Sequence, residues 1–226
     1  MVGYFCKSFG FAGLGKKGDR VFNFRLELGT IEMSKGPKPF QVDLDPKTGI
    51  PGRYKEKQVR RLSDLRGFFS DNDLVEELLA RGKNPIIYEV YEIPQIPSEG
   101  LFSLACTVLH PGKVGREYYF TKGHFHAKEP TSEVYVGLKG DGIILLQTRD
   151  GRVAPLPLKA GGVVYIPPRW AHRSINTGKE KMVFLAVYPS DAGHDYESIK
   201  RSGFARLLVE RGSKSKLIKN PVRKGK

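Results

Sequence analysis

Three of the five histidines in the chain occupy places that suit one metal ion. His124 and His126 are separated by one residue, and such a pair projects to the same face of a β-strand. Glu133 follows seven residues after His126, a gap that allows a turn and a return strand. His172 arrives after a second turn. Three imidazoles and one carboxylate suit a borderline divalent ion such as Fe, Mn, Ni or Zn.

The segment that leads to His172 has a turn pattern of its own. Gly161-Gly162 precedes a short apolar strand, Pro167-Pro168 bends the chain, and His172 then lies on the next strand. Two histidines in an HxH pair often occur by chance, but a glutamate and a third histidine at matching positions argue against chance. Coordination positions left to water or substrate would make such an ion catalytic rather than structural.

Short segments rich in β-branched and aromatic residues predict antiparallel β-structure from residue 86 onward. Gly, Pro or Asp turns separate them, and Arg149-Asp150-Gly151 is a clear hairpin signal. Eight or more short strands favour a barrel or jelly roll. The expected strands cover residues 86–93, 101–109, 116–122, 133–138, 142–148, 152–158, 163–166, 182–187 and 204–210.

A few short peripheral helices are expected around this all-β fold. Residues 59–85 contain the best helix, with Asp71 or Ser70 as its N-cap and Gly82 at its end. The apolar residues at helical spacing are Leu74, Val75, Leu78 and Leu79. Two shorter helical segments are expected near Ser63 and at residues 196–202.

A chain of 226 residues with 39% hydrophobic residues suits one β-barrel domain with extensions. We expect residues 37–212 to form this domain, including an N-terminal strand and helix segment. Residues 1–36 are interpreted as a poorly ordered extension of doubtful status, because a segment resembling a natural start begins at Met33. Residues 213–226 are interpreted as a basic, disordered C-terminal tail.

The net charge of +14 comes in large part from this tail. A basic tail can bind nucleic acid, but no RRM, zinc-finger or helix-turn-helix pattern accompanies it, so nucleic-acid binding is not expected. Cys6 and Cys106 lie outside any CxxC pattern, which favours reduced cysteines and a cytoplasmic location. No apolar run approaches the ~20 residues of a membrane span, and no signal-peptide pattern is found.

The two histidine stretches resemble the two motifs of the cupins. The first cupin motif is G-x5-H-x-H-x3,4-E-x6-G, and six residues rather than three or four precede the glutamate here. The residues that match it are His124, His126, Glu133 and Gly140. The second motif is G-x5-P-x-G-x2-H-x3-N, and Arg169 stands where its second glycine is usual. The residues that match it are Gly161, Pro167, His172 and Asn176. The resemblance implies a cupin-type antiparallel β-barrel or jelly roll.

A narrower resemblance is to the archaeal cupin-type glucose-6-phosphate isomerases. That family also has the longer gap before its glutamate, so this departure supports the match. The resemblance covers roughly residues 37–222 and does not cover residues 1–32. The sequences that carry it are FTKGHFHAK at 120–128, EVY at 133–135 and YPSDAGHDY at 188–196, extended by the segments 59–64, 88–91, 107–109 and 111–115.

This resemblance implies an intramolecular aldose–ketose isomerase that interconverts glucose 6-phosphate and fructose 6-phosphate in glycolysis and gluconeogenesis. It implies a cytoplasmic homodimer with one divalent ion per subunit, Fe²⁺ by preference and Mn, Ni or Zn as alternatives. The implied metal ligands are His124, His126, Glu133 and His172. The implied phosphate residues are Tyr88, Thr107, Thr121, Gly123 and Tyr188, while Tyr135, His194 and Tyr196 would line the sugar end.

Aldose–ketose interconversion moves hydrogen between C1 and C2, through an enediol or by a direct hydride shift. Both routes build negative charge on the sugar oxygens, which a divalent cation stabilises. Glu133 is the candidate base, with a role as metal ligand alone as the alternative. Tyr135 lies on the same strand face and is either a donor to a sugar hydroxyl or a core aromatic. Arg169 has an open role, with phosphate contact as one option.

Other cupin functions fit the same metal ligands. Three histidines and one glutamate also serve dioxygenases, although the phosphate residues argue against oxygen chemistry. Another sugar-phosphate isomerase, for example of mannose 6-phosphate, is an alternative. A non-enzymatic sugar-binding cupin is another, but such a protein would have no need to keep all four ligands. Lys122 and Lys128 lie near the first motif and are expected to be exposed to solvent.

Overall fold

The computed structural model describes residues 39–94 and 98–222. The expected N-terminal extension, with Met33, lies outside the described residues, as do Cys6 and residues 223–226. The unit from Pro39 onward is compact and is the one described below. Within it, no helix combines the length and the apolar character that crossing a bilayer requires.

Antiparallel strands dominate the described part of the chain. Their order is β1-β2-β3-β11-β6-β9 in a six-stranded sheet, β10-β7-β8 in a three-stranded sheet and β13-β12-β5-β4 in a four-stranded sheet. The strands are β1 (Glu56–Arg61), β2 (Ile86–Glu92), β3 (Phe102–Leu109), β4 (Lys113–Val114), β5 (Glu117–Tyr118), β6 (Glu133–Lys139), β7 (Asp141–Thr148), β8 (Val153–Lys159), β9 (Val163–Ile166), β10 (Trp170–Ile175), β11 (Met182–Pro189), β12 (Arg206–Arg211) and β13 (Lys214–Lys219).

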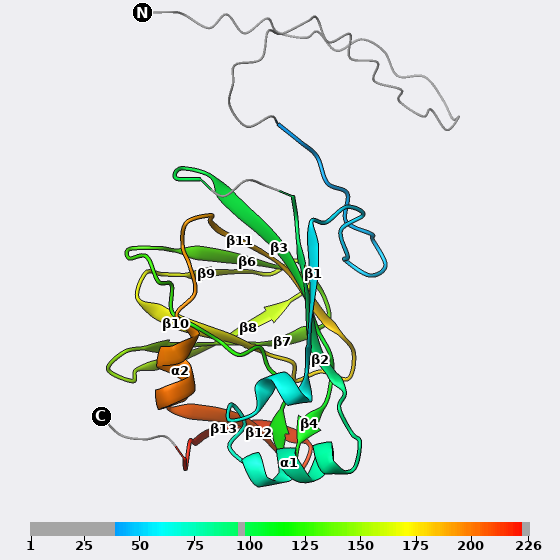
Figure 1. Cartoon of the computed structure of the whole chain (residues 1–226), viewed down its shortest axis with the longest axis vertical. Helices are drawn as coiled ribbons and strands as arrows, with labels where there is room; N and C mark the ends of the chain where they lie inside the picture. Colours follow the sequence, from blue (N-terminus) through cyan, green and yellow to red (C-terminus); the bar gives the residue numbers. More distant parts are fainter. Residues whose placement is uncertain (1–38, 95–97, 223–226) are drawn as a thin grey trace, which may run out of the picture. The chain divides into compact units, whose positions relative to one another are not determined.

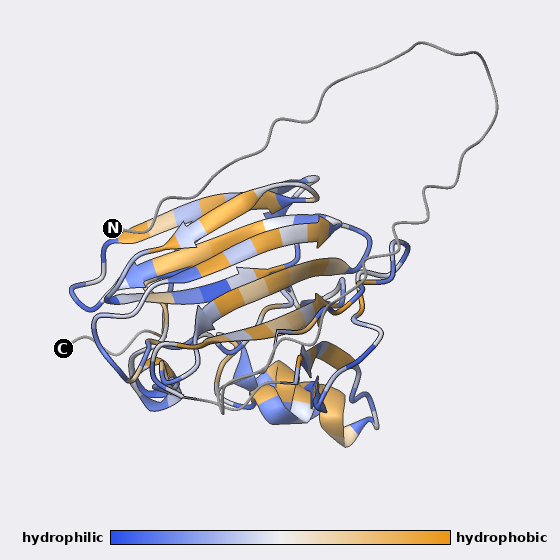
Figure 2. Cartoon of the chain, turned by 90° about the horizontal axis from the view of Figure 1, so that it is seen from above, coloured by the Kyte–Doolittle hydropathy of each residue, from blue (hydrophilic) through white to orange (hydrophobic). Residues whose placement is uncertain are grey.

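The six-stranded sheet faces the three-stranded sheet, and the four-stranded sheet lies with the helices at one end of both (Figure 1). Hydrophobic and hydrophilic residues alternate along the strands (Figure 2), as expected where one face of each sheet is buried. In β6, Glu133, Tyr135 and Gly137 are buried while Val134 and Val136 are only partly buried. This parity directs Glu133 and Tyr135 to the interior.

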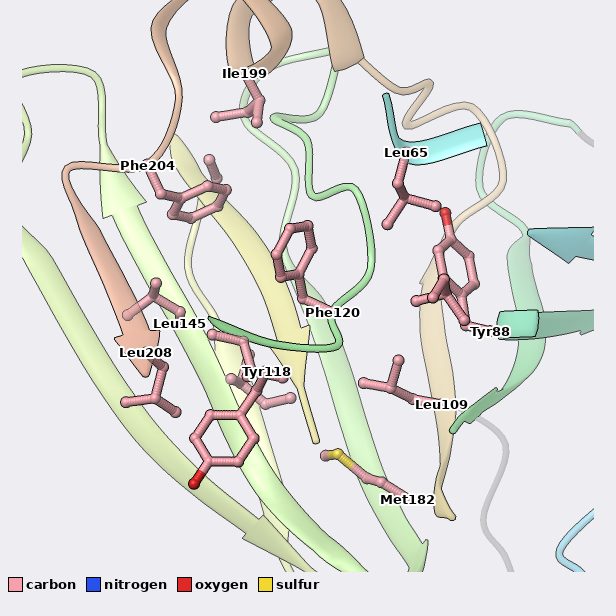
Figure 3. Close-up of a cluster of buried hydrophobic side chains, with 14 of the residues drawn as sticks. Leu65, Tyr88, Leu109, Tyr118, Phe120, Leu145, Met182, Ile199, Phe204 and Leu208 are labelled. Carbon is pink, nitrogen blue, oxygen red and sulfur yellow. The ribbon is translucent and has the colours of Figure 1, made fainter. Parts of the chain in front are cut away.

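The hydrophobic core gathers at the end of the sheets that the helices close. Phe120 lies between Phe204 on one side and Leu65 with Tyr88 on the other (Figure 3). Phe120, Phe204 and Leu65 are almost completely buried, and each contributes roughly 1.5–3 kcal/mol by leaving water. Because Tyr88 belongs to this cluster, the core supports the candidate site directly.

The helical segments are η1 (Leu62–Leu65), α1 (Asn72–Ala80) and α2 (Tyr196–Ser202). The predicted cap of α1 is confirmed, because the Asp71 carboxylate accepts a hydrogen bond from the Leu74 N–H at 3.0 Å. The predicted helical region of residues 59–85 began too early in the chain. Residues 56–61 are strand β1, which pairs with β2 and places Val59 opposite Glu89.

The predicted strand over residues 116–122 is wrong beyond Tyr118, because only Glu117–Tyr118 form β5. The chain then runs beside β10, where the Thr121 N–H donates to the Ser174 carbonyl at 2.9 Å. Gly123 has a φ of +74°, outside the range of a regular strand. This irregular segment delivers the HxH pair to the interior.

The expected disordered tail is corrected by the structure over residues 214–219, which form β13 against β12. Gly212, with a φ of +61°, lies in the two-residue turn that brings Lys214 opposite Arg211. Beyond the strand, Asn220 is buried and its amide donates to the Phe204 carbonyl at 2.8 Å. The described part of the basic segment is therefore integral to the domain.

Strand β8 is the edge of the three-stranded sheet, and it contains Pro155 and Pro157. Proline lacks a backbone N–H and is found in sheets chiefly at such edges. Hydrogen bonds to the β7 side are present at both ends of β8. The Ala160 N–H donates to the Gly140 carbonyl, and the Arg152 carbonyl accepts from the Thr148 N–H. Backbone groups alternate in direction along a strand, so the even-numbered residues of β8 bond to β7. The odd-numbered Pro155 and Pro157 therefore direct their nitrogens away from β7.

Candidate active site

The two histidine stretches meet across a pair of neighbouring segments. The His124 N–H donates to the His172 carbonyl at 3.3 Å, and the His172 N–H donates back to the His124 carbonyl at 3.1 Å. This reciprocal pair brings the two imidazole centroids within 4.4 Å. Glu133 reaches the same point from the start of β6 in the facing sheet. Strand register therefore fixes three of the predicted ligands.

The carboxylate of Glu133 lies against two imidazoles. Its Oε2 atom is 2.9 Å from His172 Nε2 and 3.3 Å from His126 Nε2. Donor atoms of His124, Glu133 and His172 all lie within 4.8 Å of one another. His126 lies outside this closest group, but its ring centroid is 5.5 Å from that of His124 and 5.3 Å from that of His172. All four predicted ligands are thus neighbours.

These donors fit a metal ion because they lack other partners. The Nε2 atoms of the three histidines and Oε2 of Glu133 are buried, contact one another and have no hydrogen-bond partner outside this cluster. Buried polar atoms are almost always satisfied, so such a group of orphaned atoms requires an explanation. Metal–ligand bonds of about 2.0–2.2 Å place neighbouring donors roughly 3 Å apart, as the Glu133 contacts are.

The protonation states suit metal binding as well. Burial alone would raise the pKa of Glu133, but its contacts with His172 and His126 outweigh burial and hold the pKa at about 2. Burial, followed by the neighbouring histidines, keeps the pKa of His124 well below its ordinary value. An ionised carboxylate and a neutral imidazole are the forms that coordinate metals.

A cavity of about 90 Å³ opens in front of this cluster. Every predicted substrate residue lines it, and so does every predicted metal ligand except His126. His126 lies behind Glu133, where it contacts the buried carboxylate. Lys122 and four apolar side chains form the rest of the lining. The apolar residues are Val90, Ala105, Phe184 and Ala186, none of which we identified from the sequence.

Hydroxyl and backbone donors are available in the cavity. The Thr121 Oγ1 atom accepts a hydrogen bond from the Ser174 N–H at 3.0 Å, so its own proton is free for a ligand. A Cβ atom at position 123 would lie 2.8 Å from a ring carbon of Phe204 and 3.0 Å from the His172 carbonyl. Only glycine therefore fits between the phosphate residues and the core.

Several aromatic residues line this cavity. Burial, then the charge of Glu133, raises the pKa of Tyr135 well above its ordinary value, so its hydroxyl remains a donor. Burial lowers the pKa of His194, whose ring stacks on Tyr196 at 5.5 Å. Burial also raises the pKa of Tyr188 to about 12. The cavity thus presents neutral donors beside one carboxylate.

A second cavity, of about 680 Å³, shares six lining residues with the first: Tyr88, Val90, Lys122, Tyr188, His194 and Tyr196. The two therefore meet, and we call them the inner and the outer cavity. The outer cavity is lined by charged residues that our sequence analysis gave no role. They are Arg60, Asp64, Arg66, Glu92, Glu197 and Lys200.

Lys122, which we expected to be exposed, is half-buried and lines both cavities. Burial lowers its pKa, and the nearby charge of Arg60 lowers it further. Lys128 is half-exposed, pairs with Asp191 and lines neither of these two cavities. Lys122 lies between Thr121 and Gly123, which we had identified as candidate substrate residues. This position in the sequence could have indicated that Lys122 also lines the cavity.

Arg169 lines neither of the two cavities, so the structure does not support the suggested phosphate contact. Its Nε atom donates to the Glu129 carboxylate at 3.2 Å, and three quarters of its side chain is exposed. It has a φ of +69°, the conformation that favours the glycine usual at this place. Arg169 therefore shapes the turn before β10.

Arg173 is a supporting residue that we missed. Its guanidinium lies between the rings of Phe120 and Phe204, at 3.9 and 4.5 Å from their centroids. It also donates to the Lys122 carbonyl at 2.8 Å. This buried cation holds the segment that carries Thr121 and Gly123. The burial of Arg173 could not be predicted locally, because an arginine next to a candidate ligand histidine usually suggests an exposed strand position.

Two solved structures resemble this one over less than half of each chain. Oxalate oxidase matches with a TM-score of 0.38 and 17% identity, over 45% of this chain and 49% of its own. Oxalate decarboxylase from Bacillus subtilis matches with a TM-score of 0.37 and 22% identity, over 47% and 26%. Antiparallel sheets around a buried cluster of three histidines and one glutamate make this protein a cupin.

The family model described as glucose-6-phosphate isomerase (GPI) matches residues 59–223. A glucose-6-phosphate isomerase of Thermococcus kodakarensis is 52% identical over 81% of this chain and 96% of its own length. Those of Pyrococcus furiosus and Sinorhizobium medicae are 50% and 34% identical, over 81% and 78% of this chain and 96% and 83% of theirs. The chain belongs to the glucose-6-phosphate isomerase family.

Proposed function

We propose that this protein interconverts glucose 6-phosphate and fructose 6-phosphate with the help of one divalent metal ion. The observation that carries the proposal is the set of four buried, orphaned donor atoms at the base of a cavity lined by hydroxyls. Membership of the family supplies the reaction. The alternatives of another sugar-phosphate isomerase or a non-enzymatic sugar-binding cupin find no comparable support.

His124, His126, Glu133 and His172 would hold the ion. When bound, the ion would stabilise negative charge that develops on the sugar oxygens. Glu133 orients Oε2 toward His126 and His172, and we assign its other oxygen to the sugar. Acting as a base, that oxygen would take the C2 proton and return it to C1, while the hydroxyl proton of O2 passes to O1 through the enediol. The structure is equally compatible with a hydride shift, in which Glu133 acts only as a ligand.

Tyr135 is assigned to donate a hydrogen bond to a sugar oxygen. It follows Glu133 on the same face of β6 and is held against Phe184, with ring centroids 4.6 Å apart. A raised pKa keeps its proton in place at neutral pH. His194 and Tyr196 close the same end, where the His194 ring approaches that of His124 to 4.4 Å. They would exclude water from the reacting carbons.

The phosphate group is assigned to the opposite end of the inner cavity. Thr107 is buried on β3, and the irregular segment beside β10 supplies the Thr121 hydroxyl and the Gly123 backbone. Tyr88 and Tyr188 add hydroxyls from β2 and β11. Neutral hydroxyl and N–H donors of this kind bind phosphate oxygens in many proteins.

Finer properties belong to the same proposal. We assign Fe²⁺ as the ion, with Mn, Ni or Zn as alternatives, because nitrogen-rich ligand sets with one carboxylate accept each of these. We assign a cytoplasmic homodimer that acts in glycolysis and gluconeogenesis, since the substrate is a phosphorylated metabolite. Cys106 is consistent with a reducing compartment: it is a buried free thiol that donates to the Gly49 carbonyl.

The decisive experiment removes the metal with a chelator and restores Fe, Mn, Ni or Zn one at a time. Interconversion of glucose 6-phosphate and fructose 6-phosphate should disappear and then return, and elemental analysis should find one ion per chain. Mannose 6-phosphate serves as the alternative substrate. A folded protein that is inactive with every ion would refute the proposed function.

A further inference from the structure

The residues assigned to the phosphate carry no positive charge. Tyr88, Thr107, Thr121, Gly123 and Tyr188 offer only hydroxyls and backbone groups. A sugar phosphate brings close to two negative charges at neutral pH. Moving that dianion from water to a site of neutral donors forfeits much of its hydration. A site that binds it well needs positive charge nearby.

The outer cavity holds three cations without counterions. Arg60 on β1, Lys122 before the HxH pair and Lys200 on α2 all line it. Among the described residues, no carboxylate oxygen lies within 4.0 Å of their charged nitrogens. Because Arg60, Lys122 and Lys200 line one cavity, their like charges repel one another. An anion placed among the three would relieve this repulsion.

Within the described part of the chain, the acidic residues of the same cavity form no ion pair with these three cations. The Asp64 carboxylate accepts from the Arg61 N–H at 2.8 Å, and the Glu92 carboxylate accepts from the Gln58 amide at 3.0 Å. Glu197 is exposed in the first turn of α2. A fourth cation, Arg66, is already paired with Glu76, whose oxygens lie 2.9 and 3.2 Å from its Nε atom.

Tyr88 connects these cations to the phosphate residues. Burial raises the pKa of its hydroxyl to about 12. Tyr88 lies directly opposite Arg60 in the register of β1 and β2. Tyr88 also lines both cavities. A phosphate held by the Tyr88 hydroxyl at the junction of the cavities would therefore lie next to Arg60 and Lys122.

We propose that Arg60, Lys122 and Lys200 form a cationic subsite that binds the phosphate group of the substrate from the outer cavity and selects dianionic sugar phosphates over neutral sugars. This inference rests on the proposed function, because it concerns the substrate of the same site. The inner donors orient the phosphate, and the three cations supply the charge that draws it in. Binding should weaken steeply as salt is added, since partly exposed charges are screened.

The test measures binding of sorbitol 6-phosphate, which has no carbonyl group and is not isomerised. Titration calorimetry on the metal-loaded protein compares the wild type with the R60Q/K200Q double variant. We expect the dissociation constant to rise at least tenfold in the double variant and its dependence on salt to become shallower. Circular dichroism and the melting temperature verify that the variant is folded.

Arg66→Gln is the matched control, because it removes the same charge from the same cavity where a carboxylate already neutralises it. Its dissociation constant should stay within twofold of the wild type. The proposal is overturned if the double variant binds sorbitol 6-phosphate as the wild type does, if R66Q weakens binding equally, or if the wild type does not bind it.

Failure of the subsite and failure of the proposed function are distinguishable. Isomerase activity with an unchanged KM in R60Q/K200Q would refute the subsite and leave the function intact. Binding of sorbitol 6-phosphate that depends on Arg60 and Lys200, in a protein that isomerises neither glucose 6-phosphate nor fructose 6-phosphate, would refute the function and support the subsite.

Discussion

The inner and outer cavities share six lining residues but are built in different ways. The inner cavity takes its metal ligands from strand register, as in the reciprocal pairing of His124 with His172. The outer cavity takes its charges from the end of β1, an irregular segment and a short helix. Buried atoms without partners characterise the first, and half-exposed cations without counterions characterise the second.

This difference separates two tasks. Chemistry at a metal requires donors held in one geometry, which paired strands provide. Capture of a charged group requires charge in the right region and tolerates mobile side chains. Substitutions in the inner cavity should therefore abolish function, while substitutions around the outer cavity should change affinity and its salt dependence.

The largest effect is expected for Glu133→Gln, which keeps the shape of the side chain and removes its charge. Metal content should fall sharply and kcat/KM should drop by about 1000-fold, because the charge-stabilising ion is lost. Elemental analysis and steady-state kinetics measure both quantities. Tyr135→Phe is the control, with full metal content and a smaller loss of activity. Full occupancy in the Glu133 variant would show that the imidazoles alone hold the ion.

Chelation should next lower the stability of the whole domain. The orphaned donors are buried together only in the folded state, so an ion present at 1000 times its dissociation constant adds about 4.1 kcal/mol. Denaturant titrations with and without a chelator measure the difference. A variant with both His124 and His172 changed to Asn should not respond to metal. Equal midpoints for the wild type with and without metal would contradict the metal site.

Gly123→Ala tests the junction of the two cavities. Its new Cβ would contact Phe204 and the His172 carbonyl at a φ of +74°, so we expect a loss of about 2–4 kcal/mol. Gly67→Ala has a similar φ of +76° and no atom within 4 Å, and should cost only about 1 kcal/mol. Thermal or chemical unfolding measures the difference. If both variants lost the same unfolding free energy, backbone strain alone would explain the effect of Gly123→Ala.

The smallest effect is expected at Arg169, in the turn that precedes β10. Arg169→Gly relieves a left-handed conformation, while Arg169→Ala removes the same exposed contact with Glu129 and keeps the strain. The glycine variant should exceed the alanine variant by about 1 kcal/mol in unfolding free energy. Activity should change little in either. A more stable alanine variant would show that the turn is not strained.

The candidate metal ligands were predicted from short-range rules. Parity along β6 places Glu133 on the same face as Tyr135, as expected, whereas the HxH pair lies in an irregular segment rather than on a strand. Capping chemistry identified Asp71 correctly. No local sequence pattern could predict that Arg60 and Lys200 line the same cavity. They are far apart in the chain, and only the fold brings them together. The motifs therefore revealed the inner cavity and not the outer one.

Two other differences have separate physical causes. Strand β13 was missed because its lysines suggested a tail, although Gly212-Ser213 is a typical two-residue hairpin turn. The segment after Tyr118 was predicted as a strand because its residues have high β-propensity. Its backbone instead bonds to β10 and turns at Gly123, a tertiary effect that overrides propensity.

The outward nitrogens of Pro155 and Pro157 bear on how copies of this protein associate. An added strand needs donors along the edge it joins, and β8 lacks two of them on its outer side. Continuous sheet growth is blocked there, which protects the folded protein against edge-to-edge aggregation. A second subunit that pairs by strand addition would have to use another border, such as β1 or β9, the outer strands of the six-stranded sheet.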